Sequence, residues 1–320
     1  MKTHKARSLL AAIGIAAGII GAGSADAADK VVRIAHQKLG TLALLKSTGA
    51  LEDKLKALGY KVTWTEFPAG PQLLEGLNVG AVDFGHTGEA PPIFAQAANA
   101  ALLYVGHEPR SPASEAILVP GNSAIQSVAD LKGKRVALNK GSNVHYLLVQ
   151  ALQQAGLKYG DITPVFLTPA DARAAFVSGS IHAWVIWEPF RAAAEATAGA
   201  RTLKDGAGLV ANHEFYLASR KFATENPEVI ATILSAVGDE GQRANRDIPA
   251  VAAQFSRSVG IPAPILETAL KRTSFGAKPI TPEVVAEQQK IADTFFSLGL
   301  IPKAIKISDA VQPVPGSGTK

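Results

Sequence analysis

The 320-residue sequence contains no cysteine. This absence excludes a disulfide framework, a thiolate nucleophile, thiolate metal ligation and a lipid-modified N-terminal cysteine. The sequence also lacks any run of five or six consecutive basic residues, although its net charge is +5. Because proteins that bind nucleic acids concentrate their basic residues, nucleic-acid binding is not indicated.

Metal ligands at helical spacing are missing as well. None of the seven histidines stands four residues from another, which is the spacing of a helical zinc site. The sequence also shows no motif for a cofactor and no nucleophile beside a base. We therefore expect no metal ion, no cofactor and no catalytic residue.

Long apolar runs are confined to the N-terminus. Basic residues at positions 2, 5 and 7 precede an apolar run over residues 9–20, and Ala25-Asp26-Ala27 supplies small residues for cleavage after Ala27. This pattern is typical of a secretory signal peptide. The run is shorter than the roughly 20 residues that span a bilayer. We expect residues 1–27 to be removed, the mature protein to lie in the periplasm, and no part of it to insert into the membrane.

Two stretches of the chain share one pattern. Residues 76–89 and residues 175–188 each read as the end of a helix, a glycine, a short apolar strand and a glutamate ahead of a proline. Glycine suits the left-handed position after a helix, and proline cannot continue a central strand, so both strands should stop at Glu89 and Glu188. Two similar α/β lobes that face each other would enclose a cleft. The alternative is that this order recurs by chance, as it can in any α/β protein.

The length fits about two domains, and apolar strands alternate with helices. Such alternation predicts a mainly parallel sheet in each lobe. We expect strands over residues 31–36, 61–67, 82–86, 102–105, 116–119, 135–138, 163–167, 181–187 and 215–219. We expect helices over residues 42–58, 71–78, 144–155, 171–177, 226–243, 249–259, 264–272 and 282–298, and another that begins at Pro91.

Ligands of such sheets bind beyond the carboxyl ends of the strands, so the loops there are the candidate sites. These loops cover residues 37–41, 87–89, 140–143 and 187–188. Gly141-Ser142-Asn143 stands between a strand and a helix, where unpaired helix amides can bind an anion. Ser142 and Asn143 could equally be plain N-caps. The same two alternatives hold for Gly40-Thr41.

Other side chains in these loops are polar or aromatic. Gln37, Thr41 and Thr87 offer neutral hydrogen-bonding groups, and their alternative role is ordinary loop polarity. Trp187 could form an aromatic wall for the apolar part of a ligand.

Three ionisable side chains also belong to this candidate region. Glu89 and Glu188 could form an acid and base pair, although no nucleophile accompanies either, so a supporting or cation-binding role is favoured. His145 lies on the first turn after Gly141, where it could reach the mouth of the anion site or only cover the start of the helix.

Several motifs together resemble a known family. They occupy residues 66–80, 87–97, 141–145, 169–176 and 183–190. Across nearly the whole mature chain, the sequence closely resembles the aliphatic-sulfonate-binding proteins of ABC importers, the SsuA/TauA kind. Two positions depart from the family pattern. His86 stands where the family usually has a small residue, and His182 replaces a common Asp.

The resemblance implies a type II periplasmic binding protein, in which two α/β lobes joined by a double-crossing hinge close over an alkanesulfonate. The lobes would comprise residues 28–112 plus 212–320 and residues 113–211, with hinges near 110–115 and 208–214. Such a receptor is not an enzyme; it acts as a monomer and delivers its ligand to a membrane permease driven by an ATPase. The alternatives are taurine, nitrate, a sulfate ester or a thiamine precursor as ligand, or an enzyme on the same fold.

The resemblance also implies which residues bind the ligand. A sulfonate is a permanent monoanion, so neutral donors and helix amides suffice and no buried Lys or Arg is required. The candidate ligand-binding residues are Gln37, Gly40, Thr41, Thr87, Gly88, Glu89, Gly141, Ser142, Asn143, His145, Trp187 and Glu188.

Overall fold

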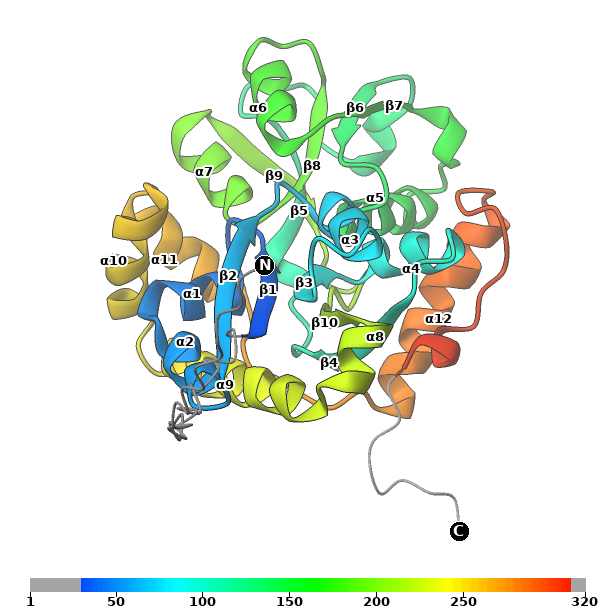
Figure 1. Ribbon diagram of the computed structural model, residues 1–320. Helices are drawn as coiled ribbons and strands as arrows, with labels where there is room; N and C mark the ends of the chain where they lie inside the picture. Colours follow the sequence, from blue (N-terminus) through cyan, green and yellow to red (C-terminus); the bar gives the residue numbers. More distant parts are fainter. Residues whose placement is uncertain (1–29, 312–320) are drawn as a thin grey trace, which may run out of the picture.

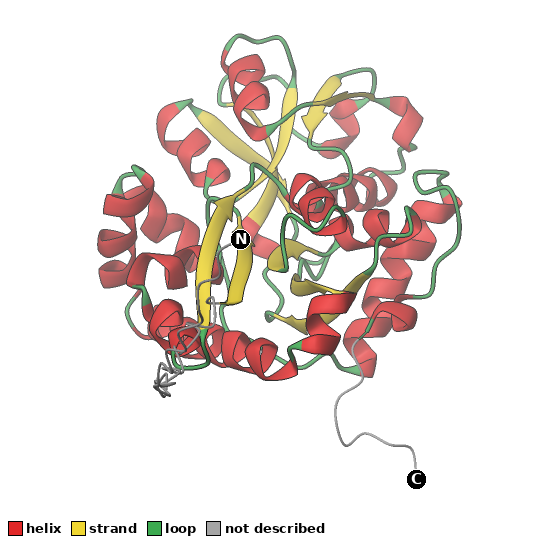
Figure 2. Ribbon diagram, viewed as in Figure 1, coloured by secondary structure: helices red, strands yellow, loops and turns green. Residues whose placement is uncertain are grey.

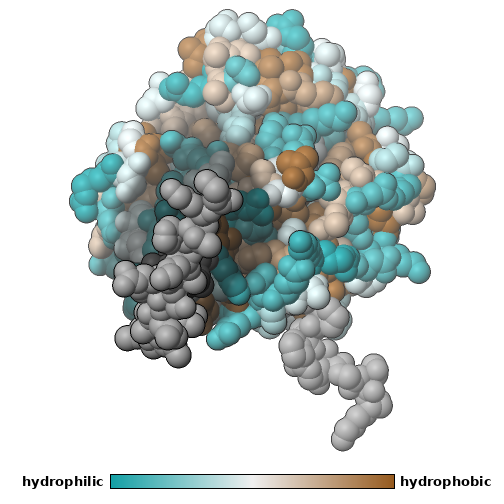
Figure 3. Space-filling model, viewed as in Figure 1, coloured by the Kyte–Doolittle hydropathy of each residue, from teal (hydrophilic) through white to brown (hydrophobic). Residues whose placement is uncertain are grey.

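The computed structural model of the chain describes residues 30–311. The predicted signal peptide, residues 1–27, lies outside this range. The described residues form two α/β lobes, each built around a five-stranded sheet (Figures 1 and 2). Within them, no helix combines the length and the apolar character that crossing a bilayer requires. On the face shown in Figure 3, hydrophilic and hydrophobic residues are interspersed.

The two sheets have the same arrangement. The first has the strand order β2-β1-β3-β10-β4 and the second has the order β7-β6-β8-β5-β9. In each, the first three strands are parallel, and the fourth strand runs antiparallel to its neighbours. The first sheet consists of β1 (Lys30–His36), β2 (Tyr60–Glu66), β3 (Phe84–Gly88), β4 (Leu102–His107) and β10 (Glu214–Ser219). The second consists of β5 (Glu115–Pro120), β6 (Arg135–Leu138), β7 (Thr163–Phe166), β8 (Ala183–Trp187) and β9 (Ala200–Asp205).

This equivalence explains the repeated sequence pattern. Strands β3 and β8 carry the two copies, and each is the central strand of its own sheet. Both strands end one residue before a glutamate, Glu89 after β3 and Glu188 after β8, as predicted. Both begin two residues later than expected; before β3, Asp83 instead accepts hydrogen bonds from Arg33. The repeat is therefore structural, and it points the two glutamates toward the same interlobe region.

The chain crosses between the sheets twice. It leaves the first lobe after β4 and enters β5 at residue 115, and it returns between the end of β9 at residue 205 and the start of β10 at residue 214. The returning strand β10 pairs with β3 and β4, which confirms the predicted return. The predicted lobe boundaries at residues 112 and 212 fall within these two crossings.

Helices cover both faces of each sheet (Figure 1). The first lobe carries α1 (Thr41–Thr48), α2 (Ala50–Lys56), α3 (Gly70–Asn78), α4 (Ala90–Ala97), α8 (Arg220–Glu225), α9 (Pro227–Arg246), α10 (Ile248–Val259), α11 (Ala263–Lys271) and α12 (Pro282–Ser297). The second carries α5 (Asn143–Gln154), α6 (Pro169–Val177) and α7 (Phe190–Thr197). Short 3-10 turns are η1 (Pro112–Ser114), η2 (Val128–Leu131), η3 (Tyr159–Asp161) and η4 (Ile307–Ala310).

The core of the first lobe follows from the alternation of side chains along its strands. Ile34 on β1 packs into a cluster with α1, α2 and α9, whereas the next residue, Ala35, packs into a cluster with α3, α4 and α12. The sheet is therefore buried on both faces, which fixes the positions of the loops at its carboxyl end.

The predicted helix over residues 42–58 is wrong in one respect. Gly49 adopts a left-handed conformation with φ 72°, and its N–H closes the end of α1 on the carbonyl of Lys46. The chain therefore turns and restarts as α2. Strand β9 and helices α7 and α8 were not predicted. Strand β9 is a half-buried edge strand, so its sequence lacks the apolar run of a central strand.

Candidate ligand-binding site

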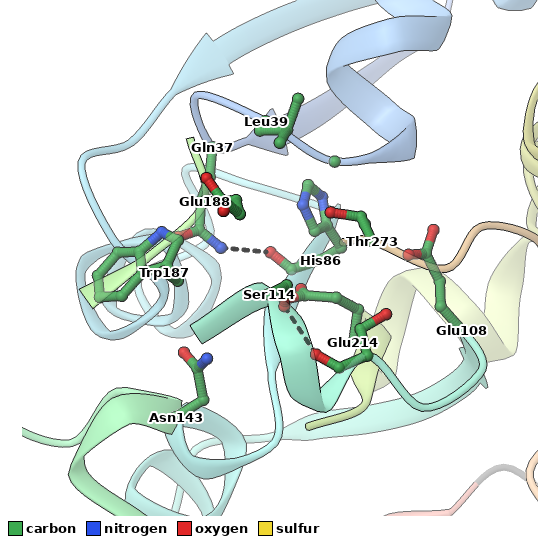
Figure 4. A pocket seen from close by; sticks show the side chains of 12 residues that line it. Gln37, Leu39, His86, Glu108, Ser114, Asn143, Trp187, Glu188, Glu214 and Thr273 are labelled. Carbon is green, nitrogen blue, oxygen red and sulfur yellow. Dashed lines mark hydrogen bonds between the residues drawn. The ribbon is translucent and has the colours of Figure 1, made fainter. Parts of the chain in front are cut away.

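A cavity of about 40 Å³ lies between the lobes. Residues from both lobes and from both crossings surround it (Figure 4). Its lining residues are Gln37, Leu39, Gly40, His86, Glu108, Ser111, Ser114, Asn143, Trp187, Glu188, Glu214 and Thr273. No lysine or arginine belongs to this lining. A ligand anion would therefore have to be held by neutral groups and helix amides.

Five of the predicted site residues line this cavity, namely Gln37, Gly40, Asn143, Trp187 and Glu188. They come from the loops after β1 and β8 and from the start of α5, so three of the four predicted loops reach the cavity. The other predicted residues do not line it. They are Thr41, Thr87, Gly88, Glu89, Gly141, Ser142 and His145.

The N-terminus of α1 faces the cavity at Gly40. This residue has φ 127°, which glycine adopts without strain, and a Cβ there would lie 2.3 Å from Nε2 of His86. No side chain caps the helix, so its first amides keep their hydrogen-bonding capacity. The plain N-cap alternative for Thr41 is therefore wrong, because its hydroxyl donates instead to the carboxylate of Glu108.

The N-terminus of α5 is also free of a side-chain cap. The hydroxyl of Ser142 donates to the carbonyl of Asn139 at 2.8 Å. The Nδ2 group of Asn143 donates to Oε2 of Glu115 at 2.6 Å and to Oδ1 of Asn212 at 3.0 Å. Both amide hydrogens of Asn143 are thus used within the protein, so its side-chain amide has no hydrogen left for a ligand.

Asn143 also forms a close contact between the lobes. A Cβ on Gly88, at the end of β3, would lie 2.8 Å from Cγ of Asn143 at the start of α5. Glycine at position 88 therefore allows the end of β3 and the start of α5 to approach each other. Beside it, the buried hydroxyl of Thr87 donates to the carbonyl of Gly88 rather than facing the cavity.

His145 is fully buried away from the cavity. Its Nδ1 accepts from the N–H of Gly141 at 3.3 Å, and its Nε2 lies 2.9 Å from the hydroxyl of Tyr159. Its ring contacts Phe94 and Phe295 of the first lobe, with ring centroids 6.2 and 5.6 Å apart. Burial lowers the pKa of His145 to about 4, so the ring is neutral at physiological pH. These contacts place it in the packing between the lobes rather than at the mouth of the site.

Glu188 lines the cavity but is already paired. Its Oε2 accepts from the N–H of Ala192 at 3.0 Å, and its Oε1 accepts from Nη1 of Arg272 at 2.9 Å. Nη1 of Arg272, which follows α11 of the first lobe, also lies 2.8 Å from Oε2 of Glu195 on α7. Burial raises the pKa of Glu188, and the hydrogen bond from Ala192 and the pairing with Arg272 oppose this shift. The pair joins the two lobes beside the cavity.

Glu89 lies behind the cavity. Its Oε2 accepts from the backbone N–H of His213 at 3.1 Å, and its backbone carbonyl accepts from Nε2 of Gln288 at 2.5 Å. Burial raises the pKa of Glu89 to about 8. Since Glu89 does not line the cavity and Glu188 is paired with Arg272, the structure gives no support to an acid and base pair formed by these two residues.

Most of the cavity-lining residues that the two crossings provide were not predicted from the sequence. Ser111 and Ser114 come from the first crossing, Glu108 stands at its start, and Glu214 stands at the end of the second. Burial raises the pKa of Glu108 to about 7, while hydrogen bonds from Thr41 and Tyr216 oppose the shift. No pattern in the sequence shows that the crossings line the cavity.

Comparison with known proteins identifies the family. The NMT1/THI5-like family profile matches residues 56–244. A protein of Escherichia coli K12 that is named for binding aliphatic sulfonates is 45% identical over 92% of this chain and 93% of its own. The chain belongs to the aliphatic sulfonate-binding protein family. A Bacillus subtilis protein with the same name is 34% identical over 88% of this chain and 86% of its own.

Solved structures agree with this assignment. The alkanesulfonate-binding protein SsuA from Xanthomonas axonopodis pv. citri, bound to MOPS, matches with a TM-score of 0.85 and 41% identity over 89% of this chain and 98% of its own. SsuA from Escherichia coli, a periplasmic protein, matches with a TM-score of 0.79 and 46% identity over 88% of this chain and 97% of its own. These relatives confirm the periplasmic binding protein fold and a binding role rather than an enzymatic one. The desulfurization enzyme DSZB, at 16% identity and a TM-score of 0.63, shares the fold alone.

Proposed function

We propose that this protein is the periplasmic substrate-binding component of an ABC importer and that it captures aliphatic sulfonates between its lobes as a source of sulfur. The proposal includes export by the signal peptide over residues 1–27, action as a monomer, and delivery of the ligand to a permease driven by an ATPase. Relatives that are 45% and 41% identical are named for sulfonate binding, and the second is bound to MOPS, a propanesulfonate with a morpholine ring.

The observation that carries the proposal is a cavity without a cation at the uncapped start of a helix. Gly40 brings the first amides of α1 to the cavity, and the helix dipole adds a partial positive charge there. A sulfonate is fully ionised at physiological pH and offers three acceptor oxygens, which suit amide donors. The indole N–H of Trp187 is a further neutral donor, and its ring gives the alkyl chain an apolar surface.

The predicted residues divide into two groups in this proposal. Gln37, Gly40, Asn143, Trp187 and Glu188 line the cavity, and they would contact the ligand or shape the space around it. The remaining seven would hold those residues in place through the contacts described above.

Calorimetric titration of the mature protein with ethanesulfonate, pentanesulfonate, taurine, sulfate and nitrate tests the ligand class. We expect an alkanesulfonate to bind with a Kd well below about 100 µM and sulfate and nitrate to bind more weakly. Tighter binding of sulfate, nitrate or taurine than of every alkanesulfonate would contradict the proposal. Mass spectrometry of the periplasmic fraction should find a mature chain that begins at Ala28.

A further inference from the structure

Glu214 is the one carboxyl group in the cavity lining that has no partner. It begins β10 and faces the cavity beside Glu108 (Figure 4). Its side chain forms no hydrogen bond with any other described residue, and its Oε2 is buried without a partner. By contrast, Glu188 pairs with Arg272, and Glu108 accepts hydrogen bonds from Thr41 and Tyr216.

The groups around Glu214 are mostly acidic. Carboxyl groups approach it from the start of α4, from the end of β4 and from the start of β5, and its own strand adds a buried tyrosine. The titratable groups in this neighbourhood are Glu89, Glu108, Glu115, His86, His213 and Tyr216.

Among the described residues, no cation pairs with Glu214, although the charge of Arg110 acts on the neighbouring Glu89. Arg110 pairs with Glu283 and Glu287, and Arg272 pairs with Glu188 and Glu195, so neither is left for Glu214. An ionised Glu214 would be an unpaired charge among other carboxyl groups in the cavity, and it would repel a sulfonate. A protonated Glu214 carries no charge, and its O–H requires a hydrogen-bond acceptor. A sulfonate oxygen is such an acceptor.

Building on the proposed function, we propose that Glu214 binds the ligand as a neutral carboxylic acid and donates its O–H to a sulfonate oxygen. When Glu214 is ionised in the free protein, binding takes up one proton from solvent; no covalent bond forms or breaks in the ligand. Burial and the neighbouring carboxyls of Glu108 and Glu89 raise the pKa of Glu214, which supports the neutral form.

The pH dependence of ethanesulfonate affinity tests this role. Titration calorimetry from about pH 6 to about pH 9.5, in buffers of different ionisation enthalpy, measures Kd and proton uptake together. We expect the wild-type affinity to fall by up to about tenfold per pH unit above the pKa of Glu214. Glu108 also lines the cavity and burial raises its pKa to about 7, so it titrates in the same range; in Glu108→Gln, the uptake should approach the one proton of Glu214. His86, whose pKa burial lowers to about 4, stays neutral throughout this range.

Three variants assign the effect to one residue. Glu214→Gln supplies an amide donor that does not titrate, so its pH profile should be flatter than that of the wild type. Glu214→Leu removes the donor and should weaken binding by about tenfold or more at every pH. Glu108→Gln should keep the fall at alkaline pH, because Glu214 is still present. Asp239→Asn removes an exposed carboxylate outside the cavity and serves as the matched control, with a wild-type profile.

The outcomes separate this inference from the proposed function. If no sulfonate binds at any pH, the proposed function fails. If ethanesulfonate binds with the same affinity and no proton uptake across the range, the sulfonate receptor stands but the role of Glu214 is wrong. If taurine binds more tightly than ethanesulfonate and gains affinity as pH rises, Glu214 acts as an ionised partner of an ammonium group, and the inference is overturned.

Discussion

Substitution of Gly88 by alanine should weaken ligand binding by preventing the lobes from closing fully. Gly88 lies on β3 of the first lobe, and a Cβ there would lie 2.8 Å from Cγ and 2.9 Å from Oδ1 of Asn143 in the second lobe. Asn143 cannot easily move aside, because its amide group donates to Glu115 and Asn212. Gly88 is not among the glycines with positive φ, so alanine fits the backbone of the strand itself.

The magnitude follows from the two ways in which the clash can be relieved. Displacing Asn143 loses two buried hydrogen bonds of about 1 kcal/mol each. Keeping it in place instead overpacks the contact, which typically costs about 1 to 3 kcal/mol. Either way the closed arrangement loses about 2 kcal/mol, which corresponds to a Kd about 30-fold higher. If the lobes separate in the ligand-free protein, the clash is absent there, and the thermal stability without ligand should change little.

Calorimetry with ethanesulfonate measures the affinity, and small-angle scattering with and without ligand measures closure. Gly160→Ala is the matched control, because a Cβ at Gly160 meets no atom within 4 Å. In a double-mutant cycle, Gly88→Ala should cost less in the Asn143→Ala background than in the wild type, because Cγ and Oδ1 of residue 143 are gone and only its Cβ, 2.9 Å from the added methyl group, remains. An unchanged Kd in Gly88→Ala, or full additivity in the cycle, would refute the reasoning.

Three further substitutions test other parts of the site. Arg272→Met should raise Kd by about tenfold and leave a more open shape in small-angle scattering, because it breaks the ion pairs of Arg272 with Glu188 and Glu195. An unchanged Kd would show that these ion pairs do not support closure of the lobes. Trp187→Leu should weaken pentanesulfonate binding by about tenfold or more, and loss of folding by circular dichroism would instead assign Trp187 to the core. Glu89→Gln should raise the melting temperature more at pH 8 than at pH 5. Burial raises the pKa of Glu89 in the folded protein to about 8, so folding favours the protonated carboxyl group. The stability of the wild-type protein is therefore lost as pH rises from about 4.5 toward 8, and the variant avoids this loss. Equal gains in melting temperature at pH 5 and pH 8 would contradict this reasoning.

Local patterns were sufficient to predict the parts of the fold that repeat. The two helix, glycine and strand copies place β3 and β8 at the centres of equivalent sheets, and the glutamates after them stand at the strand ends as expected. Gly49 shows the limit of such reasoning. Its neighbours have the composition of one continuous helix, but its left-handed φ of 72° divides them into α1 and α2. Periodicity alone does not show which conformation a glycine adopts.

The site was predictable where it depends on strand ends and less so where it depends on the crossings. Gln37, Trp187 and Glu188 follow directly from the rule that ligands bind beyond the carboxyl ends of strands. Glu108 and Glu214 are more than a hundred residues apart, and they meet where β4 pairs with β10, with the backbone N–H of Glu108 donating to the carbonyl of Glu214 at 2.8 Å. A pairing between two chain crossings leaves no periodic signal in the sequence.

Two contacts between the lobes would have to break if the lobes open to admit a ligand. On one side of the cavity, Arg272 ties the end of α11 to Glu188 and Glu195; on the other, His145 of α5 packs against Phe94 and Phe295. The side chains of Arg272 and Glu195 are 25% and 22% exposed and that of Glu188 is buried, so salt weakens this ion pair only in part, whereas the aromatic contact is insensitive to salt. Opening would have to break both, because each of them joins one lobe to the other. Added salt should therefore lower the ligand affinity only through its effect on the ion pairs of Arg272. In Arg272→Met, this contribution to the salt dependence of Kd should be absent.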